Sequence, residues 1–307
     1  MPQQTIKPPQ LADTMPNNTN QKISIIIPAN NEASSLRRIL PDLQKHHPEA
    51  EIIVVNDGST DDTAQLEDEI PGIKVLNLPY NLGNGGAVKS GARAATGDIL
   101  IFMDADGQHQ PKDVALLLKR FYEDKLDMVI GARTKCSQAS LGRAIANKFY
   151  NRLASWMSGY PIPDLTSGFR VVQADKFKSF LHLLPNGFSY PTTITMSFFR
   201  SGYTVGYESI KTGLRQGRKS HINPIKDGMR FLLIIFKIGS LYSPLKLFLP
   251  ISIFTFASGI GLYAYNYIIH GRFTNMSALL LSTSLLVFLI GMVSEQITNL
   301  MFSRRER

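Results

Sequence analysis

The sequence predicts an α/β fold in which a doubly wound, mostly parallel sheet is followed by an interfacial helix and a two-helix transmembrane hairpin. Two observations predict the sheet. Short β-branched runs alternate with helical segments between residues 22 and 223, and polar clusters directly follow several of these runs. Strands that alternate with helices form parallel sheets covered on both faces. A third observation, two long charge-free apolar stretches within residues 244–307, predicts the hairpin.

The chain of 307 residues divides into four parts by composition. Residues 1–21 are rich in Pro, Gln, Asn and Thr, which predicts a disordered tail. This tail has no apolar segment, so we do not interpret it as a signal peptide. Residues 22–223 are expected to form a soluble domain, residues 224–243 an interfacial amphipathic helix, and residues 244–307 the hairpin with a basic end.

The expected strands of the soluble domain share runs of Ile and Val. They are Lys22–Pro28, Glu51–Val55, Ile73–Leu78 and Ile99–Met103. The expected helices between them are Glu32–His46, Thr60–Glu69 and Gly85–Ala95. Ser59 or Thr60 is expected to cap the second helix, because hydroxyl side chains accept from the free amides of a first turn. Asp61 and Asp62 then lie in that turn, where the helix dipole favours acidic residues.

The hairpin is predicted from Leu247–Tyr265 and Ala278–Ser294, which are both charge-free and apolar. Each is close to the roughly 20 residues that cross a bilayer. A short polar segment, Asn266–Ser277, links them. The alternative is a pair of buried core helices. A helix that is apolar on all sides in so small a protein is better explained by lipid.

The net charge of +9 indicates an anionic partner. Nucleic acid is not expected, because the chain has no dense Lys/Arg run and no known nucleic-acid motif. An anionic membrane surface explains the charge better. Basic residues flank both outer ends of the hairpin, whereas the link carries only Arg272. The excess of positive charge on cytoplasmic flanks therefore predicts that both ends and the soluble domain face the cytoplasm.

Two segments combine basic and apolar residues in the manner of helices that lie in the membrane interface. Pro224–Tyr242 comes just before the first span and is the main candidate. Leu141–Met157 is the second, although an ordinary surface helix packed on the core explains it equally well. The single cysteine, Cys136, excludes an internal disulfide and a Cys-rich metal site.

Polar clusters follow three of the expected strands, at Asn30–Glu32, Asp57 and Asp104–Asp106. Because ligands bind at the carboxyl ends of strands in such sheets, we expect these clusters to form one composite site. Asp104 and Asp106, with the amide of Gln108, can hold a hard divalent cation such as Mg²⁺ through oxygen. The alternative for this motif is a solvated turn.

Several motifs in order resemble those of a family 2 glycosyltransferase with the GT-A fold. They are Ser24–Glu32, Val54–Asp61, Asn81–Gly85, Lys89–Gly91, Ala95–Asp98 and Asp104–Asp106. Taken alone, the stretch Asn81–Gly86 fits either a phosphate-cradling loop or a flexible turn. Asp164–Arg170 and the C-terminal hairpin are similar to polyprenyl-phosphate glycosyltransferases, the group that includes dolichyl-phosphate mannose synthases. The resemblance covers residues 22–223 by motif and the hairpin by architecture.

The resemblance implies roles for the matching residues. The nucleotide-sugar donor would be bound by Pro28, Asn30, Glu32, Val55, Asp57, Lys89, Asp104, Ala105, Asp106 and Gln108. Mg²⁺ or Mn²⁺ would be held by Asp104, Asp106 and Gln108. The acceptor phosphate would be bound by Arg133, Ser167, Arg170, Lys219 and His221. The catalytic residues would be Asp104, Asp106, Arg133 and Arg215, with Arg133 acting as a forked donor to the acceptor phosphate or the donor diphosphate.

One departure from the family pattern concerns the end of the soluble domain. The family often has Arg-x-x-Gly-x-Ser-Lys there, whereas Arg215–His221 has Gly one place early and His where Lys is usual. Arg215 still fits a phosphate contact. Which of Arg218, Lys219 and His221 replaces the missing Lys is left open.

The sequence therefore predicts an enzyme that transfers a hexose, mannose or glucose, with inversion to a dolichyl or undecaprenyl phosphate at the cytoplasmic membrane face. GDP-mannose and UDP-glucose are the expected donors. An acceptor that is already anionic has less need of a strong general base. The alternatives are a family 2 transferase with a sugar hydroxyl acceptor, in polysaccharide or glycolipid synthesis, and an inactive membrane scaffold. Membrane lipids are expected partners, and a homo-oligomer is left open.

Overall fold

The structure is a computed structural model that describes residues 21–133, 141–187, 189–210, 236–237 and 239–303. For residues 141–147 and 303 it describes the backbone alone. Several expectations from the sequence lie outside the described residues. These are nearly all of the tail 1–21, most of the interfacial helix 224–243 and the basic end 304–307.

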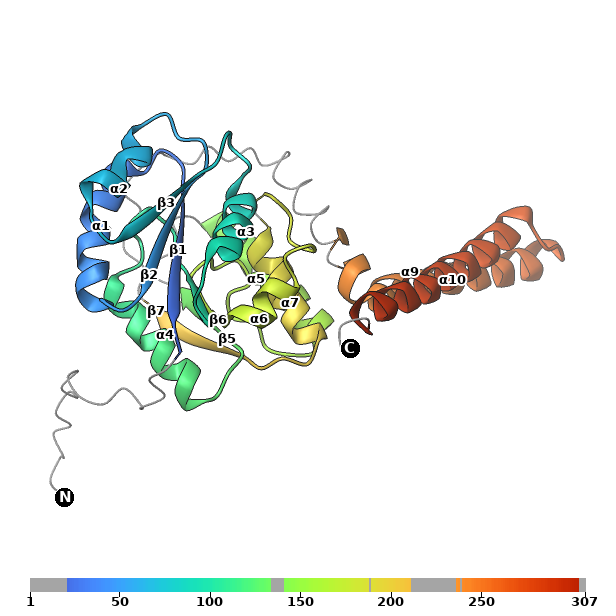
Figure 1. Cartoon of the computed structure of the whole chain (residues 1–307). Coiled ribbons are helices and arrows are strands. Elements are labelled where there is room, and N and C mark those ends of the chain that lie inside the picture. The colour runs from blue at the N-terminus through green and yellow to red at the C-terminus, as the bar shows by residue number, and fades with distance from the viewer. Residues whose placement is uncertain (1–20, 134–140, 188, 211–235, 238, 304–307) are drawn as a thin grey trace, which may run out of the picture.

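A seven-stranded sheet in the order β3-β2-β1-β4-β6-β5-β7 forms the centre of the soluble domain (Figure 1). Its strands are β1 Ile23–Ala29, β2 Glu51–Asn56, β3 Ile73–Asn77, β4 Ile99–Phe102, β5 Met128–Arg133, β6 Arg170–Gln173 and β7 Val205–Ile210. Among these strands only β6 runs antiparallel to its neighbours, β4 and β5. The predicted doubly wound, mostly parallel sheet is confirmed.

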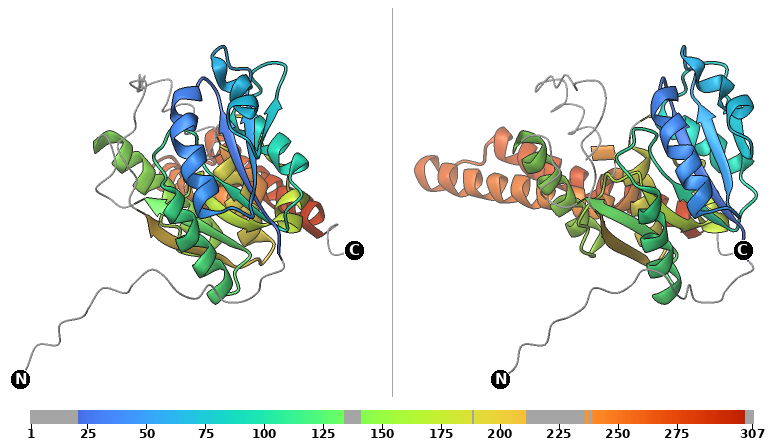
Figure 2. Two further views of the ribbon diagram at one scale, coloured as in Figure 1. Left: turned by 60° about the vertical axis from the view of Figure 1, so that its left-hand side comes forward. Right: turned by 90° about the vertical axis from the view of Figure 1, so that its left-hand side faces the viewer.

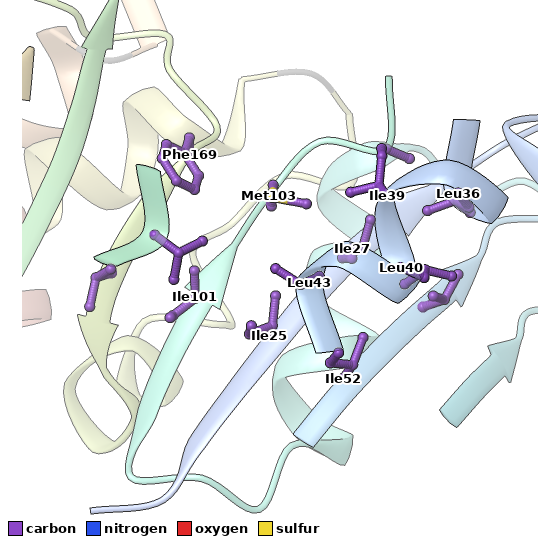
Figure 3. Packing of buried hydrophobic residues seen from close by; sticks show 14 of the residues in the cluster. Ile25, Ile27, Leu36, Ile39, Leu40, Leu43, Ile52, Ile101, Met103 and Phe169 are labelled. Carbon is purple, nitrogen blue, oxygen red and sulfur yellow. The ribbon is translucent and has the colours of Figure 1, made fainter. Parts of the chain in front are cut away.

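Helices cover both faces of this sheet (Figure 2). The helices of the domain are α1 Ala33–His46, α2 Leu66–Glu69, α3 Asn84–Ala94, α4 Pro111–Glu123, α5 Leu141–Ser158, α6 Ala174–Ser179 and α7 Tyr190–Arg200. Of these, α5 packs on α7. Successive side chains of a strand point to opposite faces. Ile25 and Ile27 of β1 therefore pack against α1 (Figure 3), whereas Ile26 packs on the opposite core with α3 and α7.

The segment expected as one helix over Thr60–Glu69 is a short 3₁₀ helix, η1 Asp62–Gln65, followed by α2. The prediction that Ser59 or Thr60 caps this segment is wrong. Asp61 caps η1, since its carboxylate accepts from the amide of Thr63 at 3.1 Å and from the amide of Ala33 at 3.0 Å. The carboxylate thereby ties the start of η1 to the start of α1 and holds together two loops at the sheet edge.

The hairpin consists of α9 Pro244–His270 and α10 Asn275–Ser303, which run side by side away from the soluble domain (Figure 1). Both helices are long and apolar enough to cross a membrane, and only 11% and 17% of their most apolar windows are buried within the protein. The alternative of buried core helices is therefore wrong. Ser252 of α9 donates to the carbonyl of Ser284 in α10 at 2.8 Å. Gly271, with φ 61°, ends α9 in the left-handed conformation that glycine adopts without strain.

The hairpin contacts the soluble domain at the base of both of its helices. Arg200, at the end of α7, pairs with Glu295 of α10 at 2.8 Å and also donates to Asn299 at 2.5 Å. The second carboxylate oxygen of Glu295 accepts from the amide of Leu245 at the start of α9, at 3.3 Å. Phe302 lies 5.9 Å from the ring of Tyr242. Charge pairing and aromatic packing thus attach the hairpin to the domain.

Candidate active site

A cavity of about 360 Å³ opens at the carboxyl ends of β1, β2, β4 and β5. The three polar clusters expected to meet do so here. Ten of the residues singled out from the sequence line it, namely Pro28, Asn30, Glu32, Asp57, Asp104, Ala105, Asp106, Gln108, Arg133 and Ser167. The parallel order of β2, β1 and β4 explains why residues up to 80 positions apart share one rim.

One side of the cavity is shaped by Asp57, which is 4% exposed. Its carboxylate accepts from the amides of Leu82 at 2.6 Å and Gly83 at 2.9 Å, while its carbonyl accepts from Asn30 at 2.7 Å. Gly83 has a φ of 87°, and a Cβ there would lie 2.7 Å from the carbonyl of Asn186. The glycine-bearing stretch is thus a fixed loop, held by Asp57, whose backbone approaches the opposite wall closely.

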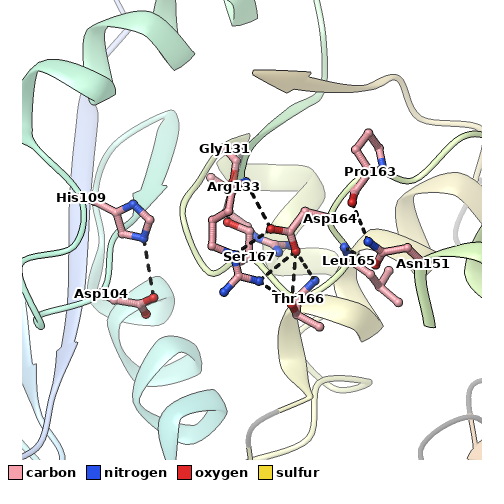
Figure 4. A network of polar contacts seen from close by, with 11 residues as sticks. Asp104, His109, Gly131, Arg133, Asn151, Pro163, Asp164, Leu165, Thr166 and Ser167 are labelled. Atoms are coloured by element: carbon pink, nitrogen blue, oxygen red, sulfur yellow. Dashed lines mark hydrogen bonds and ion pairs between the residues drawn. The ribbon is translucent and has the colours of Figure 1, made fainter. Parts of the chain in front are cut away.

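Asp104 and Asp106 form the acidic part of the cavity, directly after β4. Asp106 accepts from the amide of Gln108 at 3.1 Å, which folds the turn so that all three side chains share the cavity. His109 is buried, stacks on Phe169 at 4.6 Å and places Nε2 3.9 Å from Asp104 (Figure 4). Sequence reasoning missed His109, although it follows the Asp104–Gln108 motif immediately.

The charge of Asp104 is stabilised by its surroundings. Burial would raise the pKa of this carboxyl, but contact with His109 and the nearby guanidinium groups of Arg133 and Arg170 lower the pKa below its usual value. The side chain keeps 40% exposure towards the cavity. The carboxylate of Asp104 is therefore held in its ionised form and faces the cavity.

These residues fit a magnesium or manganese ion. Such cations take a few protein oxygens and complete their shell with water and substrate phosphates. The carboxylates of Asp104 and Asp106, with the amide oxygen of Gln108, supply that kind of donor set. In the described part of the chain no group of three or more His, Cys, Asp or Glu side chains could hold a metal by itself.

Arg133, at the end of β5, faces the acidic residues across the cavity. Its Nε and Nη2 donate to the two carboxylate oxygens of Asp164 at 2.8 and 3.0 Å, and Nη2 also donates to Thr166 at 2.6 Å (Figure 4). In this structure the fork is directed at Asp164, and the expected contact of Arg133 with a phosphate stays a prediction. The remaining nitrogen, Nη1, is the group that Arg133 can offer to a ligand.

Three expected ligand residues do not line the cavity. Val55 is fully buried in the core between β2 and α3. Its side chain packs so closely on Gly91 of α3 that a Cβ added to this glycine would lie only 2.9 Å away. Lys89 donates to the carbonyl of Leu184 at 3.1 Å and to the side chain of Asn186, which anchors the loop before α7. The expected contacts of these two side chains with the donor are corrected accordingly.

Arg170 is the third expected ligand residue that does not line the cavity, and its side chain is 0% exposed. Its guanidinium donates to the carbonyls of Ser167 and Pro191, the latter at 3.3 Å, and lies 5.8 Å from the ring of Tyr190. The expected contact of Arg170 with the acceptor phosphate is therefore wrong. Instead the side chain supports two residues that line the cavity from behind.

The cavity has further lining residues to which the sequence assigned no individual role, although several of them lie in the motifs Ser24–Glu32, Asn81–Gly86 and Asp164–Arg170. They are Ala29, Asn81, Gly83, Asn84, Ala87, His109, Thr166, Gly168 and Pro191. Gly168 lies beside Asp104, and a Cβ at this position would be only 3.0 Å from the carboxylate. Arg215, Lys219 and His221 lie outside the described residues.

The fold and this site define an α/β protein with a polar, acidic cavity at the carboxyl edge of its sheet. Residues 24–181 match glycosyl transferase family 2, and residues 243–300 match the GtrB C-terminal hairpin. The chain belongs to glycosyl transferase family 2 and is a glycosyltransferase with a C-terminal, membrane-associated hairpin. The resemblance stated from the sequence motifs is confirmed.

Two relatives have named activities. The UDP-N-acetylglucosamine–dolichyl-phosphate N-acetylglucosaminyltransferase of Methanococcus voltae is 30% identical over 179 residues, which cover 51% of this chain and 71% of that protein. The undecaprenyl-phosphate mannosyltransferase of Micrococcus luteus is 32% identical over 173 residues, which cover 52% of this chain and 69% of that protein.

A solved structure confirms the fold. The glucosyl-3-phosphoglycerate synthase of Mycobacterium tuberculosis, in complex with Mn²⁺, UDP and glucosyl-3-phosphoglycerate, superposes with a TM-score of 0.56. The match covers 71% of this chain and 78% of that chain at 19% identity. At this identity the likeness establishes the GT-A architecture.

Proposed function

We propose that this enzyme transfers a hexose, mannose or glucose, from a nucleotide-sugar to a polyprenyl phosphate at the cytoplasmic face of a membrane, with inversion. The observation that carries the proposal is a cavity with two carboxylates on one side and an arginine on the other, in a chain that ends in an apolar hairpin. The named relatives act on dolichyl and undecaprenyl phosphates, which supports the acceptor class.

The donor half of the proposal rests on β1, β2 and β4. Pro28, Asn30, Glu32 and Asp57 would surround the nucleoside, and they line one continuous side of the cavity. Asp104, Asp106 and Gln108 would hold Mg²⁺ or Mn²⁺. When bound, the cation would neutralise charge that develops on the leaving diphosphate. The Mn²⁺ and UDP of the mycobacterial synthase support a metal of this type.

The acceptor half rests on Arg133 and Ser167, which line the same cavity as the carboxylates; the hydroxyl of Ser167 donates to the carbonyl of Gly131 at 2.7 Å. Nη1 of Arg133 would donate to a phosphate oxygen, since its other nitrogens are committed to Asp164. Arg215, Lys219 and His221 remain candidates for further phosphate contacts from the sequence motif. A fixed guanidinium loses little freedom on binding, and charge-assisted hydrogen bonds are stronger than neutral ones.

The chemistry would proceed by direct displacement. An oxygen of the acceptor phosphate forms a bond to the anomeric carbon while the bond to the donor diphosphate breaks on the opposite face. The nucleophile is already ionised, so the residues of the cavity need to orient it and need not remove a proton. Attack from the opposite face inverts the anomeric configuration. The intact carboxylates argue against the alternative of an inactive scaffold.

The membrane arrangement follows from the reactants. The acceptor phosphate lies at headgroup depth, so the cavity must lie against the membrane surface. Pro224–Tyr242 would lie in the interface, as the sequence predicted, and α5, for which the sequence left an ordinary surface helix equally open, would lie there too. In α5, Phe149 is 62% and Trp156 51% exposed, whereas Tyr150 and Met157 are buried against the domain. Exposed aromatic residues of this kind favour the membrane–water boundary.

A donor panel tests this proposal. The purified full-length protein is incubated with a polyprenyl phosphate in vesicles and with GDP-mannose, UDP-glucose or UDP-N-acetylglucosamine, each with and without Mg²⁺ or Mn²⁺. We expect one hexose donor to yield a polyprenyl-phosphate sugar of inverted anomeric configuration, and only with metal. A product with retained configuration, or transfer of N-acetylglucosamine alone, would contradict the proposal.

A further inference from the structure

A second cavity, of about 450 Å³, lies where the hairpin joins the soluble domain. Its walls come from the ends of α5 and α7, the start of α9 and one residue of α10. The residues that matter here are Met157, Phe199, Arg200, Lys246, Leu249 and Glu295. The volume is within the range of about 300–1,000 Å³ typical of sites for small ligands.

The position of this cavity along the hairpin sets its depth in the membrane. Lys246 and Leu249 lie in the first turns of α9, which has 27 residues. Since about 20 residues cross the hydrocarbon core, the first turns lie at headgroup level. Trp156 and Tyr160 are both more than half exposed beside this cavity, and Tyr160 stacks on Phe199 at 5.1 Å. These exposed rings match the aromatic residues that mark membrane interfaces.

The charges on the walls favour an anion. Arg200 and Glu295 neutralise each other at 2.8 Å. Lys246 donates to the carbonyls of Met157 at 2.9 Å and Trp156 at 3.4 Å, and none of the ion pairs among the described residues includes it. These two carbonyls lie at the C-terminal end of α5. The partial negative charge of a helix C-terminus is about half a unit, so it offsets only about half of the positive charge of Lys246. A net positive charge therefore remains on Lys246, next to the apolar side chains of Phe199 and Leu249.

The second cavity is separate from the site of transfer. Pro191, at the start of α7, lines the first cavity, and Arg200, at the end of α7, lines the second. Nine residues of helix separate these two positions by about 13 Å. The two cavities share no lining residue, so a phosphate at Lys246 would be distinct from the phosphate that would react beside Arg133. The isoprenoid chain of an acceptor is a neutral hydrocarbon and offers nothing to a lysine.

We propose that the second cavity binds an anionic phospholipid of the surrounding membrane. Its phosphodiester would accept from Lys246, and one acyl chain would run along Leu249 and the outer face of α9. The lipid would thereby join α5, α7 and the hairpin at headgroup level. This proposal rests on membrane association and does not depend on the proposed sugar transfer.

Thermal unfolding of the full-length protein in neutral detergent tests the site. Added phosphatidylglycerol should raise the unfolding midpoint by about 5 °C, because a ligand that binds only the folded state stabilises it. Phosphatidylcholine and inorganic phosphate should not. Lys246→Gln should remove most of this shift, whereas Lys246→Arg should keep it. Arg272→Gln, at the exposed far end of the hairpin, is the matched control and should also keep it.

Lys246→Gln also removes the hydrogen bonds that cap the C-terminal end of α5, and the variant could lose the shift because it folds poorly. A second variant that keeps Lys246 controls for this effect. Leu249→Trp fills the lipid side of the cavity, keeps Lys246 and should also abolish the shift. An equal shift in Lys246→Gln, or an equal effect of phosphatidylcholine or inorganic phosphate, would overturn the proposal. So would a shift that polyprenyl phosphate alone produces, because the cavity would then belong to the acceptor.

Discussion

At the residue scale, the site depends on short contacts that fix side chains before substrate binds. Asp57 fixes the glycine loop, Asp164 fixes Arg133, and Arg170 supports Ser167 from behind. Electrostatic catalysis benefits from such preorganisation, because the groups need not reorient during the reaction. Three predictions test individual residues of this arrangement.

Asp106→Asn should lower the rate of sugar transfer by at least about 100-fold, because it removes a charged metal ligand. The half-buried side chain contributes little to the core, so the free energy of unfolding should change by less than about 1 kcal/mol. Transfer rates and chemical denaturation of the purified variant check both statements. Near-full activity with saturating Mg²⁺ or Mn²⁺ would refute the metal assignment.

Arg133→Ala should lower transfer to polyprenyl phosphate by about 100-fold and spare much of the donor affinity, because Nη1 is assigned to the acceptor. Labelled nucleotide-sugar binding and transfer are measured on the same preparation. Loss of both together would make Arg133 a donor residue.

The same change leaves the buried carboxylate of Asp164 without its cation, which destabilises a protein by about 3–5 kcal/mol. The double variant Arg133→Ala with Asp164→Asn controls for this effect. It should recover stability without recovering transfer, and recovery of transfer would show that Arg133 acts through folding alone.

Gly168→Ala should raise the metal concentration needed for half-maximal activity by about tenfold, because its Cβ would lie 3.0 Å from Asp104 and displace the carboxylate. Gly187→Ala is the matched control, since a Cβ at Gly187 meets no atom within 4 Å. Titration of activity with Mn²⁺ distinguishes the two variants. An unchanged metal requirement in Gly168→Ala would show that Asp104 does not contact the ion.

Val55 and Arg170 were misplaced because the burial of each depends on packing that a local sequence pattern does not show. Val54 and Val55 are both apolar because β2 is covered on both faces, so the sequence cannot tell which side chain points where. Arg170 is an arginine beside a ligand motif, but its burial depends on the carbonyl of Pro191, 21 positions away. By contrast, Asp104 and Asp106 follow a strand directly, and their place was therefore predictable.

At the element scale, strands with long β-branched runs were predicted to within about two residues. The strands β5, β6 and β7 were not identified individually, and β6 has only four residues and pairs antiparallel with β4. A run this short has no detectable period. The hairpin was predicted from composition alone, and α9 begins at Pro244, the expected start of the hairpin, three residues before the apolar stretch Leu247–Tyr265.

Cysteine labelling tests the orientation of the hairpin. Cys136→Ser first removes the single native cysteine. A cysteine at Asn275, in the link region, should react with a membrane-impermeant thiol reagent outside intact cells, and a cysteine at residue 305 should not. The basic residues at both outer ends of the hairpin are the reason. The reverse labelling pattern would overturn the cytoplasmic assignment of the catalytic domain.

At the scale of the whole molecule, α7 connects the membrane base to the reaction cavity. Pro191 lines the cavity, while Arg200 pairs with Glu295 of the hairpin. The pair joins residues 95 positions apart, so no local pattern predicts it. This connection joins the cavity to the base of the hairpin, and in the proposed function it would hold the donor site close to the membrane that supplies the acceptor.

The central claim is that a lipid phosphate is the nucleophile. Transfer from the preferred donor is therefore measured in parallel vesicles that contain either undecaprenyl phosphate or undecaprenol, the same chain without the phosphate. The account predicts a metal-dependent sugar product with the phosphate and none with the alcohol. Equal or greater transfer to the alcohol, or to a glycolipid hydroxyl, would contradict it.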